Sequence, residues 1–353
     1  MGVTSVRQSG SARPPRPAGV REVAALANVS LGTVSNVLNN RRRVNPETRA
    51  RVQAAMSELG FVGSRAAGQL RSRRSALIGV VVPDVGNPYW ASVLRGIETV
   101  VEREGLALVV GSTHQDPARQ DRLLRGLESQ GVDGLILAPI VANSEDWQTF
   151  AFRRYGLVAL ESRRSNLAVA SVGLDDVQGA RLAVTHLLSR GHRRIVFVNG
   201  PRSVPWCAER HEGVLAGLAD HALTSDEVLL ELEVGDMTAD EGREAVAGLL
   251  TEGTDATAIM CANDMLALGA LQELRSRGFV VPADFAVIGY DDVDFAAALA
   301  PPLTSVRQPS FEMGVAAATL LLKGNSRAPG EHIGFEPELM PRVSSDVVVT
   351  ARV

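Results

Sequence analysis

Arginine dominates the chemistry that this sequence offers. Of 36 basic residues, only Lys323 is a lysine. A phosphate-binding P-loop requires a lysine, and Schiff-base catalysis requires a lysine amine, so both kinds of site are disfavoured. The arginine guanidinium instead suits bidentate contacts to phosphate groups and to guanine. The basic side chains therefore favour binding of a polyanion over covalent catalysis.

Residues that could carry catalysis do not form a recognisable constellation. The sequence contains no HExxH, no GxSxG, no zinc-finger spacing and no GxGxxG after a strand-like segment. Cys207 and Cys261 cannot build a disulfide framework, which fits a reducing compartment. His186 and His192 flank the end of a predicted helix and are interpreted as surface polar residues. We expect a protein that is not an enzyme and that needs neither a metal ion nor a cofactor.

Charge is distributed unevenly along the chain. Residues 1–74 contain 13 arginines and three acidic residues, a net charge of +10, whereas the whole chain has a net charge of −4. A small basic head on an acidic body predicts a polyanion-binding module joined to a domain of another kind. The alternative is a basic disordered tail that aids solubility. It is disfavoured because the basic stretch also contains patterned apolar residues.

Two features of the sequence bear on the compartment. No uncharged segment reaches the roughly 18 residues of a membrane span. Residues 1–19 are rich in Pro, Gly, Ser and Arg and lack the apolar segment of a secretory signal, so we expect a disordered tail. These observations predict a cytoplasmic protein with no membrane partner.

Residues 20–63 have the pattern of three short helices. Ser30 can cap the second helix, and Asn45, Pro46 and Gly60 are suited to begin and end the third. The apolar residues at helical spacing, which we expect to form the inner faces, are Val20, Val23, Ala24, Ala27, Val29, Val34, Val37 and Leu38. The pattern predicts an all-α helix-turn-helix head. Residues 64–75 follow as a linker or a short hinge helix.

From residue 76 to 353 short apolar segments alternate with helical stretches. The predicted strands lie in ALIGVVVP, LALVVGS, DGLILAP, LVALES, VASVGL, RIVFVNG, TAIMCAN, FAVIGYDD and LTSVRQP, with a terminal strand in DVVVT. Strands that alternate with helices indicate a parallel α/β sheet. About ten strands are more than one such sheet needs, so we predict a core of two doubly wound lobes. Ligands in such folds bind at the carboxyl ends of the strands, which here would meet in a cleft between the lobes.

The predicted division of the chain has four parts. They are a tail at 1–19, the head at 20–63, the hinge at 64–75 and the core at 76–353. Within the core, the first lobe is expected to span about 76–173 and 306–328. The second lobe is expected to span about 174–305 and 329–353.

Long stretches of the chain resemble one protein family. VREVAALANVSLGTVSNVLNNRRRVNPETRARVQAAMSELGF is similar to the DNA-binding head of the LacI/GalR (lactose and galactose repressor) family of transcription regulators. LIGVVVPDVGNPYWASVLRGIE, DGLILAP, GHRRIVFVNG, CANDMLALGAL and VIGYDD resemble the effector domain of that family. The resemblance implies a cytoplasmic homodimer that binds a near-palindromic duplex operator. It also implies a hinge helix in the minor groove and a core similar to periplasmic sugar-binding proteins.

The resemblance implies which residues contact DNA. The second helix of such a head lies in the major groove and reaches base edges with its first turns. The positions expected to face DNA are Leu31, Gly32, Thr33, Ser35, Asn36 and Asn39. Leu31 suits a thymine methyl group and Asn36 suits an adenine. In the hinge, the resemblance assigns Ala67 and Leu70 to the minor groove, while Arg65 and Arg71 are expected to neutralise phosphates.

The resemblance also implies an effector cleft. Its expected residues are Asn87, Tyr89, Trp90, Arg163, Trp206, Arg210, Asn263, Asp264, Asp291 and Gln308. Aromatic rings stack on the apolar face of a sugar, and Asn, Arg and Asp side chains bind its hydroxyl groups. Tyr89 and Trp90 could alternatively pack in the core or in a dimer interface. Asp264 could merely cap a helix, and Asp291 could be a structural carboxylate in a turn.

These features predict a ligand-responsive, DNA-binding repressor of carbohydrate-metabolism genes. A sugar is the favoured effector, and a purine or another anionic metabolite remains the alternative because Arg163 and Arg210 suit anionic groups. A sugar-binding transport component would share the core, but the basic head and the missing secretory signal disfavour it. The chain has no C-terminal heptads for a helical bundle, so we expect a dimer without further assembly.

Overall fold

The structure is a computed structural model that describes residues 19–38, 44–61, 75–140, 155–160, 169–324 and 331–349. The chain divides into two compact units, Met1–Arg74 and Ser75–Val353, called here the head and the core and described separately. Most of the expected tail and hinge lies outside the described residues. So do the candidate site residues Asn39, Arg65, Ala67, Leu70, Arg71 and Arg163. Among the described residues, no helix is both long and apolar enough to cross a membrane.

The described part of the head forms three helices, as the sequence predicts. They are α1 (Val20–Leu26), α2 (Leu31–Leu38) and α3 (Pro46–Glu58). The Ser30 hydroxyl accepts a hydrogen bond from the Thr33 amide at 3.1 Å, so it caps α2. Asn45 caps α3 by accepting from the Glu47 amide at 2.9 Å, and Pro46 occupies the first helical position. These caps fix where α2 and α3 begin.

A small apolar core holds the three helices of the head together. Val23, Val34 and Val52 come from α1, α2 and α3 in turn, and each is fully buried. Ala24, Ala27, Val37 and Ala55 complete the cluster. Leu38 was expected on the inner face but is 39% exposed, because it lies at the last residue of α2, beyond the cover of the other helices. The inner-face prediction is therefore correct for Val34 and Val37 and wrong for Leu38.

The first lobe of the core is built on a sheet in the order β11-β5-β4-β3-β1-β2. All of its strand pairs are parallel. The strands are β1 (Leu77–Val82), β2 (Ala107–Ser112), β3 (Gly134–Leu137), β4 (Gly156–Leu160), β5 (Ala170–Leu174) and β11 (His332–Phe335). The helices are α5 (Pro88–Arg103), α6 (Pro117–Ser129) and α13 (Ser310–Leu322).

The apolar strands of this lobe are buried on both faces. Val81 packs with Leu124 and Leu127 of α6 on one side of the sheet. Val80 and Val82 belong to the cluster that α5 and α13 cover on the other side. Successive side chains of a strand point to opposite faces, so two covered faces require an uninterrupted apolar segment. The uninterrupted apolar segment ALIGVVVP therefore correctly predicts a strand that is buried on both faces of the sheet.

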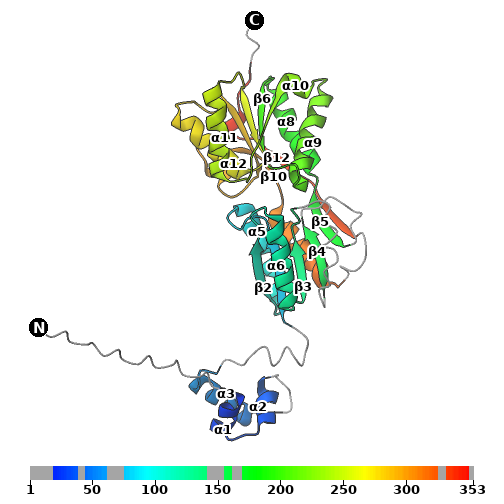
Figure 1. The fold of residues 1–353 in the computed structure, drawn as a ribbon, viewed down its shortest axis with the longest axis vertical. Helices are drawn as coiled ribbons and strands as arrows, with labels where there is room; N and C mark the ends of the chain where they lie inside the picture. Colours follow the sequence, from blue (N-terminus) through cyan, green and yellow to red (C-terminus); the bar gives the residue numbers. More distant parts are fainter. Residues whose placement is uncertain are drawn as a thin grey trace, which may run out of the picture. The chain divides into compact units, whose positions relative to one another are not determined.

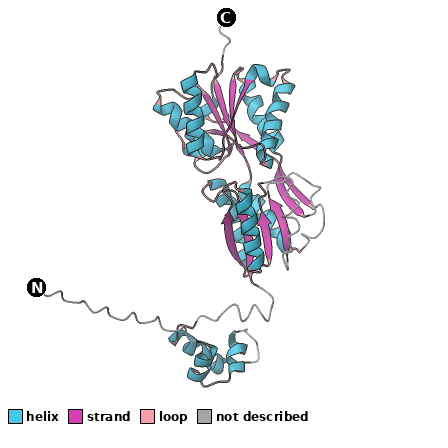
Figure 2. Cartoon of the chain, viewed as in Figure 1, coloured by secondary structure: helices cyan, strands magenta, loops and turns pink. Residues whose placement is uncertain are grey.

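The second lobe repeats this three-layer plan around a sheet in the order β12-β10-β9-β8-β6-β7. The strands are β6 (Ile195–Asn199), β7 (Leu229–Glu233), β8 (Ala258–Cys261), β9 (Ala286–Asp291), β10 (Thr304–Arg307) and β12 (Glu338–Met340). The helices are α8 (Asp176–Ser189), α9 (Pro205–Asp220), α10 (Ser225–Val228), α11 (Ala239–Glu252) and α12 (Asp264–Ser276), with short 3-10 turns at Ala296–Ala298 and Val343–Ser345. Helices α8 and α9 cover one face of the sheet and α11 and α12 the other (Figures 1 and 2).

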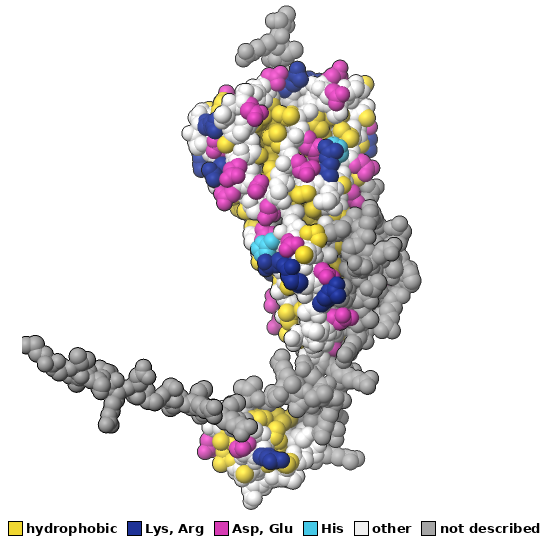
Figure 3. Space-filling model, viewed as in Figure 1, with side chains coloured by type: hydrophobic (Ala, Val, Ile, Leu, Met, Phe, Trp, Pro, Cys, Tyr) yellow, Lys and Arg dark blue, Asp and Glu magenta, His cyan; other side chains and the backbone are white. Residues whose placement is uncertain are grey.

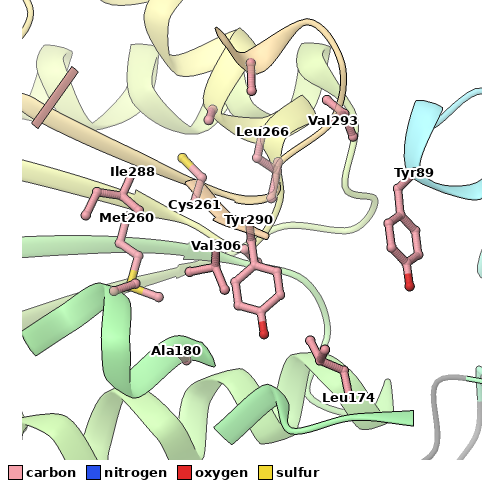
Figure 4. Packing of buried hydrophobic residues seen from close by; sticks show 14 of the residues in the cluster. Tyr89, Leu174, Ala180, Met260, Cys261, Leu266, Ile288, Tyr290, Val293 and Val306 are labelled. Carbon is pink, nitrogen blue, oxygen red and sulfur yellow. The ribbon is translucent and has the colours of Figure 1, made fainter. Parts of the chain in front are cut away.

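One aromatic ring illustrates how tightly the second lobe packs. Tyr290 is fully buried, and its ring points from β9 toward Leu174 and Ala180 (Figure 4). A Cβ atom at Gly179 would overlap the Tyr290 ring and hydroxyl group. Only glycine at position 179 therefore leaves room for the ring between the sheet and α8.

The chain passes between the lobes three times, and one predicted boundary is wrong. The passages follow β5, β10 and β11. Strand β10 pairs with β9 of the second sheet, and β11 pairs in parallel with β5 of the first. The first lobe therefore resumes after residue 307 and continues to Phe335, whereas we expected it to span 306–328. The described residues 331–335, which contain β11, were wrongly assigned to the second lobe because HIGF does not form a continuous apolar segment.

The predicted strands differ from the observed ones at the sheet edges. Strand β7 was missed because its sequence LLELE mixes apolar and acidic residues at a half-exposed edge. Strands β11 and β12 were missed because HIGF and ELM lack a continuous apolar segment and lie half exposed at the sheet edges. The expected terminal strand in DVVVT is wrong for its described residues 346–349, which are not a strand. There the Val349 amide bonds to the carbonyl oxygen of Arg190 at 2.8 Å, outside both sheets.

A buried polar network ties the segment after β12 to the second lobe. His186 of α8 lies 2.8 Å from the Ser345 hydroxyl, which lies 2.7 Å from the Thr304 hydroxyl. His186 and Ser345 are 8% and 0% exposed, and His192 is 1% exposed, so the surface position expected for the two histidines is wrong. Burial, and then the charge of Arg190, lowers the pKa of His186 to about 4. His186 therefore stays neutral in the folded chain at pH 7.

We expect this network to make the core less stable in acid. The pKa of His186 is about 4 in the folded chain and about 6.5 in an unfolded one, so the unfolded chain binds the proton first. The stabilisation is fully present above pH 6.5 and is lost as the pH falls from 6.5 through 4. His186→Gln should reduce this pH dependence, measured by urea unfolding at several pH values. His114→Gln, an exposed control, should follow wild type. Equal pH dependence in His186→Gln and wild type would contradict the assignment.

Candidate functional site

The strands of both lobes deliver polar side chains to one place. Asn87 follows β1, and Asn263 follows β8 and caps α12 by accepting from the Leu266 amide at 2.8 Å. Asp291 ends β9, and Gln308 follows β10 at a passage between the lobes. Because parallel strands end at the same edge of a sheet, residues far apart in sequence meet here. The arrangement is the cleft that the sequence predicts.

A pocket with an empty volume of about 420 Å³ lies in this cleft and opens to solvent. Its lining residues are Pro83, Asp84, Asn87, Tyr89, Trp90, Gln115, Trp206, Arg210, Asp236, Met237, Asn263, Asp291 and Gln308. Eight of the ten effector residues expected from the sequence are among them. Arg163 lies outside the described residues, and Asp264 does not line the pocket.

Asp291 links the two lobes at the floor of the pocket. Its carboxylate accepts a hydrogen bond from Gln308 Nε2 at 2.7 Å and a longer one, 3.5 Å, from Asn87 Nδ2. Asn87 belongs to the first lobe, where its own oxygen caps α5 by accepting from the Tyr89 amide. Burial raises the pKa of the Asp291 carboxyl to about 6, while Arg210, Gln308 and Asn87 oppose that rise. These donors keep the carboxylate ionised at neutral pH.

The backbone at Asp291 is unusual as well. Asp291 and Asp292 have φ values of 103° and 52°, which non-glycine residues rarely adopt. Asp292 is held in place by Arg307 Nε at 2.8 Å and by Arg342 Nη2 at 2.6 Å. Strained backbone of this kind persists where surrounding contacts fix it and is enriched at binding sites. With this backbone conformation, the Asp291 carboxylate lies within reach of Asn87 of the first lobe.

Arg210 is buried beneath the pocket and is already paired. Its side chain is 3% exposed, and its Nε donates to Asp176 Oδ1 at 2.7 Å. Its Nη1 donates to the Ala262 carbonyl at 2.5 Å, and its guanidinium carbon lies 3.8 Å from the centre of the Tyr290 ring. Much of the hydrogen-bonding capacity of Arg210 therefore serves the protein itself.

Asp264 does not have the position expected for an effector residue. It is fully buried and accepts from the Ser305 hydroxyl at 2.6 Å and from the Val293 amide at 2.9 Å. Burial, and the nearby carboxylate of Asp291, raises the pKa of Asp264 well above its usual range. The alternative role as helix cap is wrong, since Asn263 caps α12. Asp264, the first residue of α12, instead binds β10 through Ser305 and the segment after β9 through Val293.

Aromatic rings form the apolar part of the pocket. Tyr89 and Trp90 are 3% and 5% exposed, and their ring centres lie 5.0 Å apart with the planes at 78°. Trp206, at the start of α9, belongs to a separate apolar cluster with Ile140, Val204 and Cys207. Tyr89 and Trp90 also belong to the main core cluster, so the same two side chains pack in the core and line the pocket.

The rim of the pocket contains a pair that the sequence did not indicate. Gln115 follows β2 in the first lobe, and its Nε2 donates to Asp236 Oδ1 of the second lobe at 3.0 Å. Gln115 and the preceding His114 have φ values of 55° and 48°, again uncommon for non-glycine residues. Asp236 was missed because it follows the unpredicted strand β7. The position of Gln115 directly after the predicted strand LALVVGS is the signal that could have indicated it.

The described DNA-facing candidates lie on α2 of the head. Leu31 and Gly32 are exposed, and Thr33, Ser35 and Asn36 are partly exposed. Val34 and Val37, between them, are buried against α1 and α3. Figure 3 shows apolar side chains on the visible face of the head, and Leu26, Leu31 and Leu38 are each between 39% and 49% exposed. Helix α2 therefore presents small polar and apolar groups to its surroundings, as a recognition helix requires.

The family models match two parts of the chain. Residues 20–64 match the model of bacterial regulatory proteins of the lacI family. Residues 184–345 match a periplasmic binding protein-like domain. The first match covers the three helices of the head, and the second covers most of the second lobe together with α13 and β11 of the first.

Similar proteins match over almost their whole length. The HTH-type transcriptional repressor CytR of Escherichia coli K12 is 30% identical, over 92% of this chain and 93% of its own length. The crystal structure of the Lac repressor dimer bound to operator and the anti-inducer ONPF matches with a TM-score of 0.79 and 28% identity, over 94% of this chain and 99% of its own. A complex of the transcriptional regulator CelR with cellobiose matches with a TM-score of 0.67 and 31% identity, over 94% of this chain and 100% of its own.

Proposed function

Because the chain belongs to the LacI family of bacterial transcription regulators, we propose that its core senses a small polar molecule, most favourably a sugar, and thereby controls operator binding by the head. The chain is a DNA-binding regulator and not an enzyme. The observation that carries the proposal is the pocket, where side chains from both lobes converge on one volume. The aromatic rings beside carboxylates and amides support a sugar as the ligand class, as does the cellobiose bound to CelR.

The ligand acts, in this proposal, through the relative orientation of the lobes. Asn87 and Gln115 come from the first lobe, and Arg210, Asp236 and Asp291 from the second. A ligand that contacts both sets favours one orientation over others, by the difference in its affinity for them. The whole chain works as a homodimer on duplex operator DNA, so this orientation is transmitted through residues 64–75. The operator is then occupied or released according to the ligand.

The head reads the operator with α2 placed in the major groove. Leu31, Gly32, Thr33, Ser35 and Asn36 are the described contact residues of this proposal. Asn39, Arg65, Ala67, Leu70 and Arg71 complete the contact set that the family resemblance implies. The protein works in the cytoplasm, where its DNA is, and the buried free thiols of Cys207 and Cys261 fit a reducing compartment. Repression of carbohydrate-metabolism genes is the role that these properties fit best.

A thermal-shift screen of the full-length protein tests the sensing function. A ligand that binds only the folded protein must raise the unfolding temperature, by an amount that grows with its concentration. We expect at least one sugar in a panel of mono- and disaccharides to do so, and Asp291→Ala to abolish the shift. A panel without any stabilising sugar, nucleoside or sugar phosphate would contradict the proposal.

Asn36→Ala tests the role of α2 in base recognition. An asparagine that contacts an adenine through two hydrogen bonds contributes discrimination of about 1–3 kcal/mol. We expect the variant to bind its operator roughly 5- to 150-fold more weakly, with less change on unrelated DNA. Gln53→Ala, an exposed position on α3, serves as the control and should bind like wild type. A gel shift at fixed salt measures both affinities. Equal loss on operator and unrelated DNA would assign Asn36 to phosphate contact instead.

A further inference from the structure

The side-chain amides of the pocket have a fixed orientation. Gln308 Nε2 donates to Asp291, and Gln115 Nε2 donates to Asp236. Rotating either amide by half a turn would place its oxygen against a carboxylate oxygen, and two acceptors repel each other. The carboxylates therefore hold each amide with its nitrogen toward the protein.

This orientation leaves two amide oxygens without a donor. Gln115 Oε1 and Gln308 Oε1 are both buried, and no hydrogen-bond donor in the described part of the protein reaches either atom. Gln308 is only 4% exposed, and both residues line the pocket. A buried polar atom without a partner is costly, so each one is a place where a ligand can bind favourably.

Several donors around the pocket are, in contrast, already bound to acceptors of the protein. Asn87 Nδ2 donates to Asp291, and Asn263 Nδ2 donates to the Met237 carbonyl at 3.0 Å. Arg210 is the one cation among the described lining residues, and its Nε and Nη1 are bound to Asp176 and to the Ala262 carbonyl. Three carboxylates, those of Asp84, Asp236 and Asp291, also line the pocket. The pocket is therefore rich in acceptors and negative charge and poor in free cationic donors.

We propose that the effector binds mainly as a hydrogen-bond donor, placing hydroxyl or amino hydrogens on the Oε1 atoms of Gln115 and Gln308. An uncharged polyol or an amino sugar satisfies both atoms. A phosphorylated or carboxylated compound brings further acceptors and a negative charge toward three carboxylates, so it is rejected. The inference rests on the proposed sensing function and decides between the sugar and the anionic metabolite that the sequence left open.

Matched pairs of compounds test this selectivity on the full-length protein. The pairs are ribose with ribose 5-phosphate, glucose with glucose 6-phosphate, cellobiose with cellobionate, and adenosine with its monophosphate, with glucosamine added as an amine. Thermal shift and then calorimetry should detect binding only by uncharged or amine-bearing members. Tighter binding of any anionic member than of its neutral partner would overturn the inference but leave the sensing function intact. If no compound of either kind binds, the sensing function fails and the inference fails with it.

A second experiment tests the two amide oxygens directly. Gln115→Met preserves the size of the side chain but removes the acceptor, and it should lower the affinity for the bound compound roughly tenfold. Gln130→Met, at an exposed position, is the control and should bind like wild type. Monodeoxy analogues separate recognition from a structural effect. One analogue should bind wild type about tenfold more weakly than the parent compound does. The same analogue should bind Gln115→Met as tightly as the parent compound binds that variant, because both changes remove the same hydrogen bond. If every deoxy analogue loses the same factor on both proteins, Gln115 has no part in recognition.

Discussion

Arg210→Met should destabilise the core by about 3–5 kcal/mol. The guanidinium is buried together with Asp176, and its loss leaves that carboxylate, 3% exposed, without its cation. The Ala262 carbonyl loses its donor and the Tyr290 ring loses its cationic neighbour as well. Breaking one side of a buried ion pair costs much more than the pair contributes, because the remaining charge is desolvated and unpaired. Urea unfolding of the full-length protein measures the loss.

Two further variants identify the cause of this loss. In the double variant Arg210→Met with Asp176→Leu, the Asp176 carboxylate is removed together with its cation, so a large part of the stability should return. Arg181→Met is the exposed control, because it breaks an ion pair with Asp220 in which the two side chains are 45% and 40% exposed. It should leave the unfolding midpoint near that of wild type. If Arg210→Met costs no more than Arg181→Met, the buried pair is not a structural element of the second lobe.

Val34→Asp should abolish specific operator binding. Val34 is fully buried among Val23, Val52 and the other members of the small head cluster, so a carboxylate there has no partner and no water. The operator affinity should fall by at least about a thousandfold, to that of non-specific binding. Because head and core are separate compact units, the thermal transition of the core should not move.

Ser57→Asp provides the matched control for this substitution. It adds the same charge to the same unit, at an exposed position of α3. It should weaken operator binding only slightly, through charge alone. A shifted core transition in Val34→Asp would show that the two units unfold together, and normal operator binding would show that the head core is not required.

The sequence predicted the head better than it predicted the core. Ser30, Asn45 and Pro46 are local signals, since each satisfies or replaces a backbone donor within a few residues. The strands buried on both faces are also visible as apolar segments. Edge strands such as β7 and β11 are short and half exposed, so their pairing depends on neighbours that are distant in sequence. No local pattern could indicate them.

The same distinction applies to the pocket. Asn87, Asp291 and Gln308 lie next to recognisable strand ends or family motifs, and the structure brings them together. The bond between Gln115 and Asp236 joins residues 121 positions apart, across two lobes, and neither residue belongs to a motif. Asp264 shows the opposite case, where a motif residue is buried behind the site. Its carboxylate is directed to Ser305, whose position depends on a later strand.

The reciprocity of ligand and operator binding tests the central claim most directly. Calorimetry gives the affinity of the stabilising compound with and without operator DNA, and a gel shift gives the operator affinity with and without that compound. If one pocket and one operator site are coupled, the two ratios must be equal, and we expect a factor of 5 to 150. Asp291→Ala should remove the response while leaving operator affinity without ligand unchanged. Unequal ratios, a factor of one, or a normal response in Asp291→Ala would contradict control of the head through this pocket.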